Sequence, residues 1–528
     1  MSATGAPSTR HSASEQRSAA RSLARGSSLN LISGVASTVL NLGLVVLVTR
    51  GFPAEQAGVF FAATAIFLVA VRVAELGGAT GIVYFVARAR SLERHADAQR
   101  AVRLAFLPAM AASGLLAAVL VTVGIRAPDL LVAGEPGDLT SYLLLLAACV
   151  PVAVISNLAQ SATRGYGSMR ATALLERLLR PALQVLLTVA AIAVGSSVAL
   201  GAAWALPFAV TAIIGWRWMH RLRPKAPPEA AGPASPLTGR SYWSFTWARA
   251  VTSVVQIILQ RADIVLVSAL LGPAEAAIYT VATRFLVVGQ MISQSIGMAV
   301  EPQLAALLAR GDLIGTAAVY RTSTSWQILV AWPFYLASAG LAAPLLGLFG
   351  EGYEAGSTVA AVLCLTMLVA TALGSVSTVL NMAGRTTWTL ANAVLSLGTN
   401  LVLLVLLLPR IGLIGAAISW AASILVQNLL PLAQLLLQYR LHPFGRVTSV
   451  AMLVTGACFG VPLVVMMLTD APVHVRLLLV GSGVVAYLGA CWLMRGPLEL
   501  NSLAASLRRR PQPSRDAETT PTAEPTTA

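Results

Sequence analysis

Residues 57–76 read AGVFFAATAIFLVAVRVAEL, and only Arg72 and Glu75 in this stretch are charged. An α-helix needs about 20 mostly apolar residues to cross the hydrocarbon core of a bilayer. Because the stretch has that length and that character, it predicts a transmembrane helix.

The composition shows that this stretch is typical of the chain. Of the 528 residues, 57% are hydrophobic and 11% are charged, whereas a soluble domain has about 45–50% apolar and about 25% charged residues. A soluble enzyme and a disordered protein are therefore excluded. Apolar runs of helical length occur at 28–49, 57–76, 102–124, 140–161, 178–195, 198–217, 244–270, 276–299, 325–348, 357–380, 388–408, 412–436, 447–468 and 474–494. We predict an all-α, polytopic membrane protein with about 14 transmembrane helices.

The net charge of +15 comes almost entirely from arginine, because Lys225 is the single lysine. With the N-terminus in the cytoplasm, most of the arginines fall in cytoplasmic tails, loops and helix ends. Arg50, Arg126, Arg410 and Arg476 fall in the outer loops. Positive residues concentrate on the cytoplasmic side of membrane proteins. We therefore expect both termini in the cytoplasm, and we assign most of the charge to topology rather than to a nucleic-acid partner.

The sequence also repeats itself. PAEQAGVF begins at Pro53 and PAEAAIY at Pro273, and a second similarity aligns Gly167 with Gly384. Both similarities place a predicted span against the span six positions later, which is the pattern of a parallel repeat. Chance similarity between helices rich in Ala, Leu and Gly is the alternative.

The repeat predicts two six-helix lobes followed by two C-terminal helices. The segments we expect are a basic cytoplasmic tail at 1–26, a first lobe at 27–217, a cytoplasmic linker at 218–243, a second lobe at 244–436, two further helices at 437–495 and a disordered cytoplasmic tail at 496–528. Two lobes around a central cleft are a common plan of transporters.

Polar residues occupy single faces of several predicted spans. In the first span these residues are Asn30, Gly34, Ser37, Thr38 and Asn41. In the seventh span they are Arg249, Thr252, Gln256, Gln260 and Asp263. Lipid cannot hydrogen-bond such groups, so these faces should contact other helices or water. Close packing between helices is the alternative explanation for the Ser, Thr and Gly members.

Topology leaves four arginines within or beside spans unexplained, namely Arg72, Arg249, Arg261 and Arg284. The acids Glu75 and Asp263 accompany them. A charge near the centre of a bilayer costs about 2.5–3.5 kcal/mol, which favours a water-filled cavity. Arginine grips phosphate through paired donors, so its excess here favours an anionic, phosphorylated substrate. The alternative is structural pairing, of Arg72 with Glu75 and of Asp263 with Arg261 or Arg284.

Six stretches, in order along the chain, resemble the polysaccharide transporter family of oligosaccharide flippases. This family belongs to the multidrug/oligosaccharidyl-lipid/polysaccharide exporter superfamily. The stretches are ELGGATGIVYFVARARS from Glu75, QRADIVLVSALLGPAEAAIYTVATRF from Gln260, GMAVEPQLAALLARGD from Gly297, LFGEGYEAG from Leu348, NMAGR from Asn381 and IGLIGAAISW from Ile411.

The resemblance implies alternating access and the turnover of a saccharide carried on a polyprenyl diphosphate. It also implies that arginines in the cavity hold the diphosphate. The candidate substrate-binding residues are Arg249, Arg261, Arg284, Arg72, Gln256, Gln260 and Asn41. Glu75 and Asp263 are the candidates for coupling to a driving force, which is membrane potential, a proton or sodium. Related proteins often have Asp where this chain has Glu75.

The leading hypothesis is a flippase for a polyprenyl-diphosphate-linked oligosaccharide that serves cell-surface polysaccharide biosynthesis. A multidrug exporter of the same superfamily is the alternative, and it predicts an acid-lined cavity. A membrane glycosyltransferase or polymerase is a third hypothesis, but such enzymes need acidic catalytic residues and sizeable outer loops. We therefore expect a transporter rather than an enzyme.

We expect a multi-pass protein of the bacterial cytoplasmic membrane. We expect a monomer. We also expect no cofactor or metal, because the four cysteines and five histidines show no ligand spacing. The expected partners are the lipid-linked saccharide, the bilayer, and a polysaccharide polymerase or glycosyltransferases.

Overall fold

The computed structural model describes residues 32–133, 138–223, 237–469, 471–494 and 496. Nearly all of these residues are helical and none of them lies in a strand, which confirms the all-α prediction. The predicted tail at 1–26, residues 497–528 of the second tail, residues 224–236 of the linker, and Asn30 lie outside the described residues.

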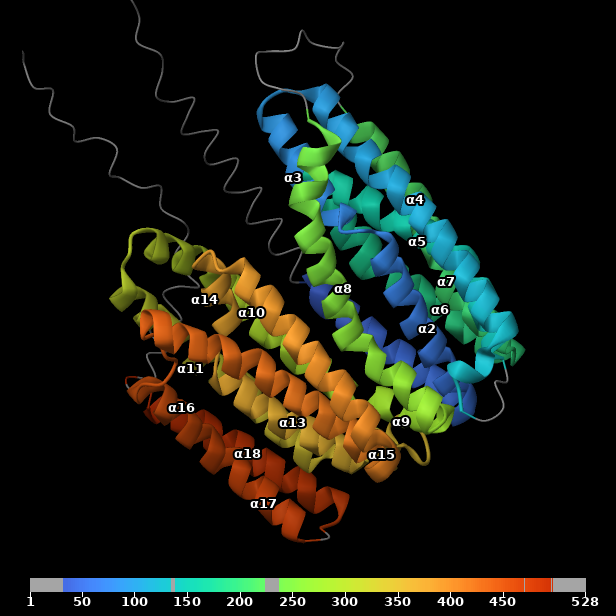
Figure 1. Ribbon diagram of the computed structural model, residues 1–528. Coiled ribbons are helices and arrows are strands. Elements are labelled where there is room, and N and C mark those ends of the chain that lie inside the picture. The colour runs from blue at the N-terminus through green and yellow to red at the C-terminus, as the bar shows by residue number, and fades with distance from the viewer. Residues whose placement is uncertain (1–31, 134–137, 224–236, 470, 495, 497–528) are drawn as a thin grey trace, which may run out of the picture.

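The first half of the chain, residues 32–223, forms one helical bundle, drawn in blue to green on the right of Figure 1. Its helices are the N-terminal helix Ile32–Gly51, α2 (Ala54–Ala74), α3 (Gly78–Ser91), α4 (His95–Arg126), α5 (Leu139–Gly165), η2 (Thr172–Leu179), α6 (Arg180–Val194) and α7 (Ser197–Leu222). Helix α5 packs against α2, α3, α4 and α7. An aromatic cluster of Phe60, Phe67, Tyr142 and Trp204 joins α2, α5 and α7.

The second half, residues 237–439, forms the other bundle. Its helices are α8 (Gly239–Leu270), α9 (Pro273–Ala282), α10 (Arg284–Ala309), α11 (Leu313–Gly340), α12 (Ala342–Gly347), α13 (Ser357–Ala372), α14 (Val376–Met382) and α15 (Thr386–Tyr439). Helix α8 packs against α2 and α3 of the first half and against α15 of its own half. It therefore contacts both halves along its length.

The last helices lie on the outer flank of the second bundle, drawn in red in Figure 1. They are α16 (Arg446–Thr455), α17 (Val461–Leu468) and α18 (Val473–Leu493), and they pack against α11. Helix α18 buries little of itself, and Val485 on it is 72% exposed. Such a surface suits lipid, because a bilayer solvates apolar side chains that water does not.

Twelve of the described helices are long and apolar enough to cross a membrane. The runs expected at 388–408 and 412–436 both lie in α15, which is interrupted at Ile411 and Gly412 by non-helical backbone angles. The run expected at 325–348 falls mostly on α11, which is not among the twelve. The multi-pass prediction is confirmed, whereas the number of 14 spans stays a prediction.

A left-handed turn ends the second predicted span just beyond Glu75. Helix α2 ends at Ala74, and Leu76 and Gly77 have φ of 49° and 71°. A side chain at Gly77 would also press against the backbone of Ala250 on α8. Glycine therefore allows both the left-handed turn and the close approach of α8.

The two repeat copies share backbone detail. Tyr166 caps α5 and Ala383 caps α14, both with φ of −73° and ψ of 2°. The following glycines, Gly167 and Gly384, both have positive φ, at 88° and 77°. These positions are 217 residues apart, so the alignment made from sequence joins residues of the same conformation.

The halves meet where the copies of the other repeat motif begin. Gly58 of α2 faces Pro273 at the start of α9 so closely that a Cβ at Gly58 would overlap the Pro273 carbonyl. The Arg50 side chain donates a hydrogen bond from Nε to the Leu348 carbonyl at 2.7 Å. Helices α2 and α9 lie side by side in the lower part of Figure 1. We call the contacts between α2 and α9 the α2–α9 seal.

Candidate functional site

A cavity of about 440 Å³ lies between the two halves. The N-terminal helix, α8, the α9–α10 junction, α10 and Trp420 of α15 line it. Five predicted site residues come together there, namely Asn41, Gln260, Arg261, Asp263 and Arg284. We call this space the arginine cavity.

The two arginines of this cavity are held differently. Arg284 is the first residue of α10, directly after the break at Thr283, and its Nε donates to the Thr280 carbonyl at 3.0 Å. The Nε of Arg261 is buried and has no hydrogen-bond partner among the described residues. Among those residues neither guanidinium forms an ion pair. Both therefore bring positive charge to the cavity wall without a paired carboxylate.

Asp263 is satisfied by other groups. The Tyr279 hydroxyl of α9 donates to its Oδ2 at 2.8 Å, and the Ile264 amide donates to its Oδ1 at 2.9 Å. The Asp263 residue is 4% exposed. Among the described residues Asp263 forms no ion pair with Arg261 or Arg284, and the Tyr279 hydroxyl is its side-chain partner instead.

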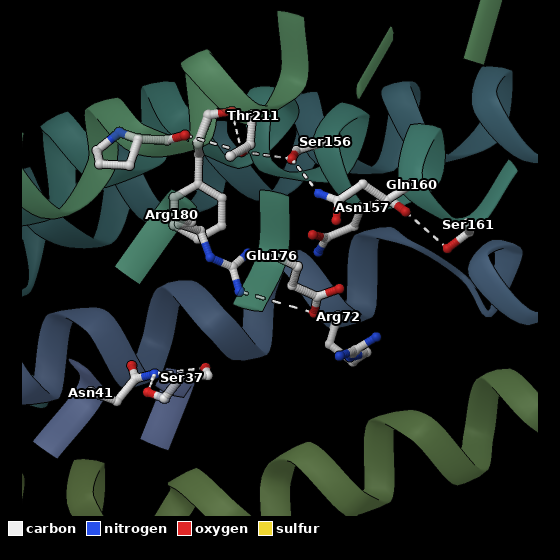
Figure 2. Close-up of polar contacts among 12 residues, drawn as sticks. Ser37, Asn41, Arg72, Ser156, Asn157, Gln160, Ser161, Glu176, Arg180 and Thr211 are labelled. Atoms are coloured by element: carbon white, nitrogen blue, oxygen red, sulfur yellow. Dashed lines mark hydrogen bonds and ion pairs between the residues drawn. The ribbon is translucent and has the colours of Figure 1, made fainter. Parts of the chain in front are cut away.

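The amides of the cavity come from three helices, because Gln290 and Gln294 of α10 line it together with Asn41 and Gln260. Asn41 donates from Nδ2 to the carbonyl and hydroxyl of Ser37, at 2.7 and 3.2 Å, as Figure 2 shows. These bonds use its Nδ2, and its Oδ1 accepts no hydrogen bond from the described residues. Gln260 follows one turn after Gln256 on α8, but Gln256 is not among the residues that line the arginine cavity.

Arg72 and Arg249 lie in a different cavity, of about 880 Å³, which we call the α3–α8 cavity. Arg249 stacks on Phe245 at 3.7 Å from the ring centroid, and it lies twelve residues before Arg261 on α8. That spacing corresponds to about 18 Å along the helix. The expectation that Arg72, Arg249, Arg261 and Arg284 share one site is therefore corrected, because α8 carries its two arginines past different neighbours.

Two further arginines of the α3–α8 cavity are not among the site residues predicted from the sequence. Arg88 of α3 and Arg164 of α5 both line it. Arg164 donates to the Ser161 hydroxyl at 2.7 Å. The polar face that Arg164 shares with Asn157 was a sequence signal for it, whereas Arg88 sits in a charged helix end that topology already explained.

The Glu75 side chain is buried and bound to two neighbouring side chains. Its carboxylate is 1% exposed, pairs with Arg72 at 2.9 Å and accepts a hydrogen bond from Asn157 at 2.7 Å. The pairing alternative for Arg72 and Glu75 is thus confirmed. Figure 2 shows Asn157 beside a buried series of hydrogen bonds. In it the Gln160 amide donates to the Ser156 hydroxyl, which is hydrogen-bonded to the Thr211 hydroxyl.

We expect the replacement Arg72→Ala to destabilise the protein by about 1–2 kcal/mol, because it leaves the buried Glu75 carboxylate without its cation. The expected loss of folding free energy is small because the Arg72 side chain is 43% exposed, and water weakens its interaction with Glu75. The midpoint of thermal unfolding in detergent measures the effect, with Arg88→Ala as the exposed control. The double variant Arg72→Ala/Glu75→Gln should recover part of the loss. Full stability in Arg72→Ala would contradict the structural role.

The described residues contain no group of three or more His, Cys, Asp or Glu side chains that could hold a metal ion. The polar side chains that line the arginine cavity carry guanidinium, amide, hydroxyl and carboxylate groups.

Comparison with known proteins places this arrangement in a family. The family described as "polysaccharide biosynthesis protein" matches residues 23–308, more than half of the chain. The chain belongs to this family. A second family, MatE, matches residues 249–406 of this family member. A search of curated protein sequences finds no significant match.

Solved structures of low sequence identity share the fold. A lipid II flippase, MurJ, in an inward closed conformation is 14% identical with a TM-score of 0.69, over 89% of this chain and 99% of that one. An inward-facing multidrug resistance MATE transporter is 16% identical with a TM-score of 0.61, over 76% and 94%. A transporter from Pyrococcus furiosus, whose reversed pocket polarity is reported to suggest a different function, is 15% identical with a TM-score of 0.55, over 80% and 95%.

The first neighbour is described as a flippase, and the other two are described as transporters of the MOP superfamily. The superfamily predicted from the six sequence stretches is confirmed, and the chain has the fold of its transporters.

Proposed function

We propose that this protein is a flippase that moves a polyprenyl-diphosphate-linked oligosaccharide across the cytoplasmic membrane of a bacterium. The observation that carries the proposal is the arginine cavity, where Arg261 and Arg284 face a space between the halves without a paired acid. The family match to polysaccharide biosynthesis proteins supports the same substrate class.

The charge of the cavity favours a diphosphate. Arg261 and Arg284 stand against Asp263, whose charge Tyr279 and a backbone amide already stabilise. A guanidinium presents paired donors that match two phosphate oxygens. In a membrane interior these hydrogen bonds gain strength because few waters compete for them. A cationic drug would meet repulsion from the same two groups.

Alternating access would follow from movement of the two halves, proposed as 27–217 and 244–436, about the arginine cavity. With both termini in the cytoplasm, the α2–α9 seal closes the outer side. In that state the headgroup would first meet the α3–α8 cavity with Arg72 and Arg249, and then the arginine cavity. The polyprenyl tail would stay in the bilayer while only the headgroup passes between the halves.

Asp263 is the stronger candidate for coupling to a driving force. It lines the arginine cavity, whereas Glu75 is enclosed by Arg72 and Asn157. A proton or a cation that binds Asp263 would change the charge next to both arginines. Monomeric action and contact with a polymerase or glycosyltransferases remain parts of the same proposal, as does the absence of enzyme activity.

A multidrug exporter is the second candidate, and the MatE match over residues 249–406 favours it. Such an exporter would need acids to receive cationic drugs. In the described arginine cavity Asp263 is the one lining acid, and its oxygens already accept two hydrogen bonds.

Deletion of the protein in its host provides the test. We expect a lipid-linked saccharide to accumulate in the cytoplasmic leaflet and the surface polymer to be lost. Lipid extraction with mass spectrometry measures the first result, and labelling of surface carbohydrate measures the second. The matched control restores the wild-type chain. Unchanged lipid intermediates together with new drug sensitivity would contradict the proposal and support the exporter.

A further inference from the structure

A third cavity, of about 460 Å³, lies within the second half of the chain. Helices α10, α11, α13, α14 and α15 supply its walls. Its polar lining includes Gln290, Gln294, Gln327, Ser375, Thr378 and Asn428. We call it the amide cavity.

The amide cavity adjoins the arginine cavity. Gln290 and Gln294, one turn apart on α10, line both spaces. Arg284 begins the same helix, six residues before Gln290, which corresponds to about 9 Å along the axis. A single elongated headgroup could therefore extend along α10 from Arg284 to the amide cavity.

The two cavities differ in chemistry. Among the described residues no Lys or Arg lines the amide cavity, and Glu301 is its one charged residue. Amides and hydroxyls both donate and accept hydrogen bonds. The hydroxyl groups of a sugar also do both, so an amide-rich wall can satisfy them without a charged partner.

Several polar atoms of this wall have capacity left for a ligand. Gln327 donates from its amide to the Ser375 hydroxyl at 2.6 Å, and Asn428 donates to the Ile424 carbonyl at 2.8 Å. These bonds use the NH₂ groups and leave the amide oxygens as acceptors. The Ser293 hydroxyl, also in the lining, is buried without a partner among the described residues.

We propose that the amide cavity is a carbohydrate subsite, which holds the uncharged saccharide of the headgroup while Arg261 and Arg284 hold the diphosphate. The inference rests on the proposed function and deepens it. It divides the recognition of one substrate between two chemically distinct spaces that share Gln290 and Gln294.

The test measures binding of two probes to the purified full-length chain in detergent. One probe is a short-chain polyprenyl diphosphate without sugar, and the other is the lipid-linked saccharide that accumulates in the deletion strain. The variant Thr378→Val/Asn428→Leu removes polar groups that line only the amide cavity and keeps their approximate size. Gln438→Ala, an exposed amide at the end of α15, is the matched control.

We expect the wild-type chain to bind the glycosylated lipid more tightly than the bare diphosphate. The double variant should bind the glycosylated lipid about 5- to 100-fold more weakly, because up to two neutral hydrogen bonds are lost, and the bare diphosphate with unchanged affinity. Gln438→Ala should match the wild type for both probes. Unaltered binding of the bare diphosphate shows that the variant is folded.

Three results would overturn the subsite. The first is equal affinity of the wild-type chain for both probes, and the second is an equal loss for both probes in the double variant. The third is a sodium site, seen as sodium binding that Glu301→Gln abolishes while saccharide affinity is unchanged in the double variant. Failure of the proposed function is different, because the wild-type chain would then bind neither probe.

Discussion

Replacement of Arg261 and Arg284 by alanine is expected to reduce transport of the lipid-linked saccharide by at least about 100-fold. Hydrogen bonds to a charged group contribute about 1.5–3 kcal/mol each, and 1.4 kcal/mol corresponds to a factor of ten. The loss of one such bond from each guanidinium already weakens substrate binding by more than the expected factor of about 100. A transport assay in proteoliposomes with fluorescent lipid-linked saccharide measures the effect.

The predicted loss of transport can be distinguished from a folding defect. Neither Arg261 nor Arg284 forms an ion pair among the described residues, and Asp263 keeps its bonds from Tyr279 and Ile264 in the variant. We therefore expect little change in thermal stability. Lysine at both positions should recover part of the transport, because it keeps the charge and loses the paired donors.

Arg310→Ala is the matched control, since Arg310 is an exposed arginine that caps the other end of α10. It should transport as the wild-type chain does. Transport at the wild-type rate in the double alanine variant would remove the arginine cavity from the substrate path.

Replacement of Gly58 by leucine is expected to give the other large effect, a loss of transport through failure of the α2–α9 seal. A Cβ at Gly58 already overlaps the Pro273 carbonyl, so the larger side chain must push α2 and α9 apart. Overpacking of this kind costs about 1–3 kcal/mol. A bias of that size shifts a two-state equilibrium by about 5- to 150-fold.

Labelling distinguishes an open seal from an unfolded protein. In a chain whose four cysteines are replaced, a single cysteine at Asn41 reports on the arginine cavity. With Gly58→Leu we expect faster labelling by a membrane-impermeant thiol reagent added outside, because the cavity is no longer closed on that side. Gly114→Leu on α4 is the control, since no atom lies within 4 Å of a Cβ built there. Normal transport in Gly58→Leu would show that the α2–α9 contact does not gate the cavity.

Local patterns in the sequence predicted the pairs that lie close along one helix. Arg72 and Glu75 are three residues apart, and helix geometry brings such side chains together. The second partner of Glu75, Asn157, comes from α5 and needed the packed bundle. In the same way Tyr279 on α9, rather than either arginine, became the partner of Asp263.

Arg249 and Arg261 of α8 lie in two different cavities, which the polar face of a single helix could not predict. Arg249, Gln256 and Gln260 recur at helical spacing, so the sequence indicated one polar stripe on α8. In the structure α8 passes α3 near Arg249 and the N-terminal helix near Gln260. Gln256, between them, is not among the residues that line either cavity.

By itself the sequence determined the membrane class, the all-α fold, the parallel repeat and the residue types available for the site. Hydropathy and helical spacing are properties of short segments, so they do not depend on distant neighbours. Only the tertiary structure decided which polar faces share a cavity. It placed Arg261 beside Arg284, joined their cavity to the amide cavity through Gln290 and Gln294, and set Gly58 against Pro273. These contacts join residues far apart in the chain, and their positions follow from how whole helices pack.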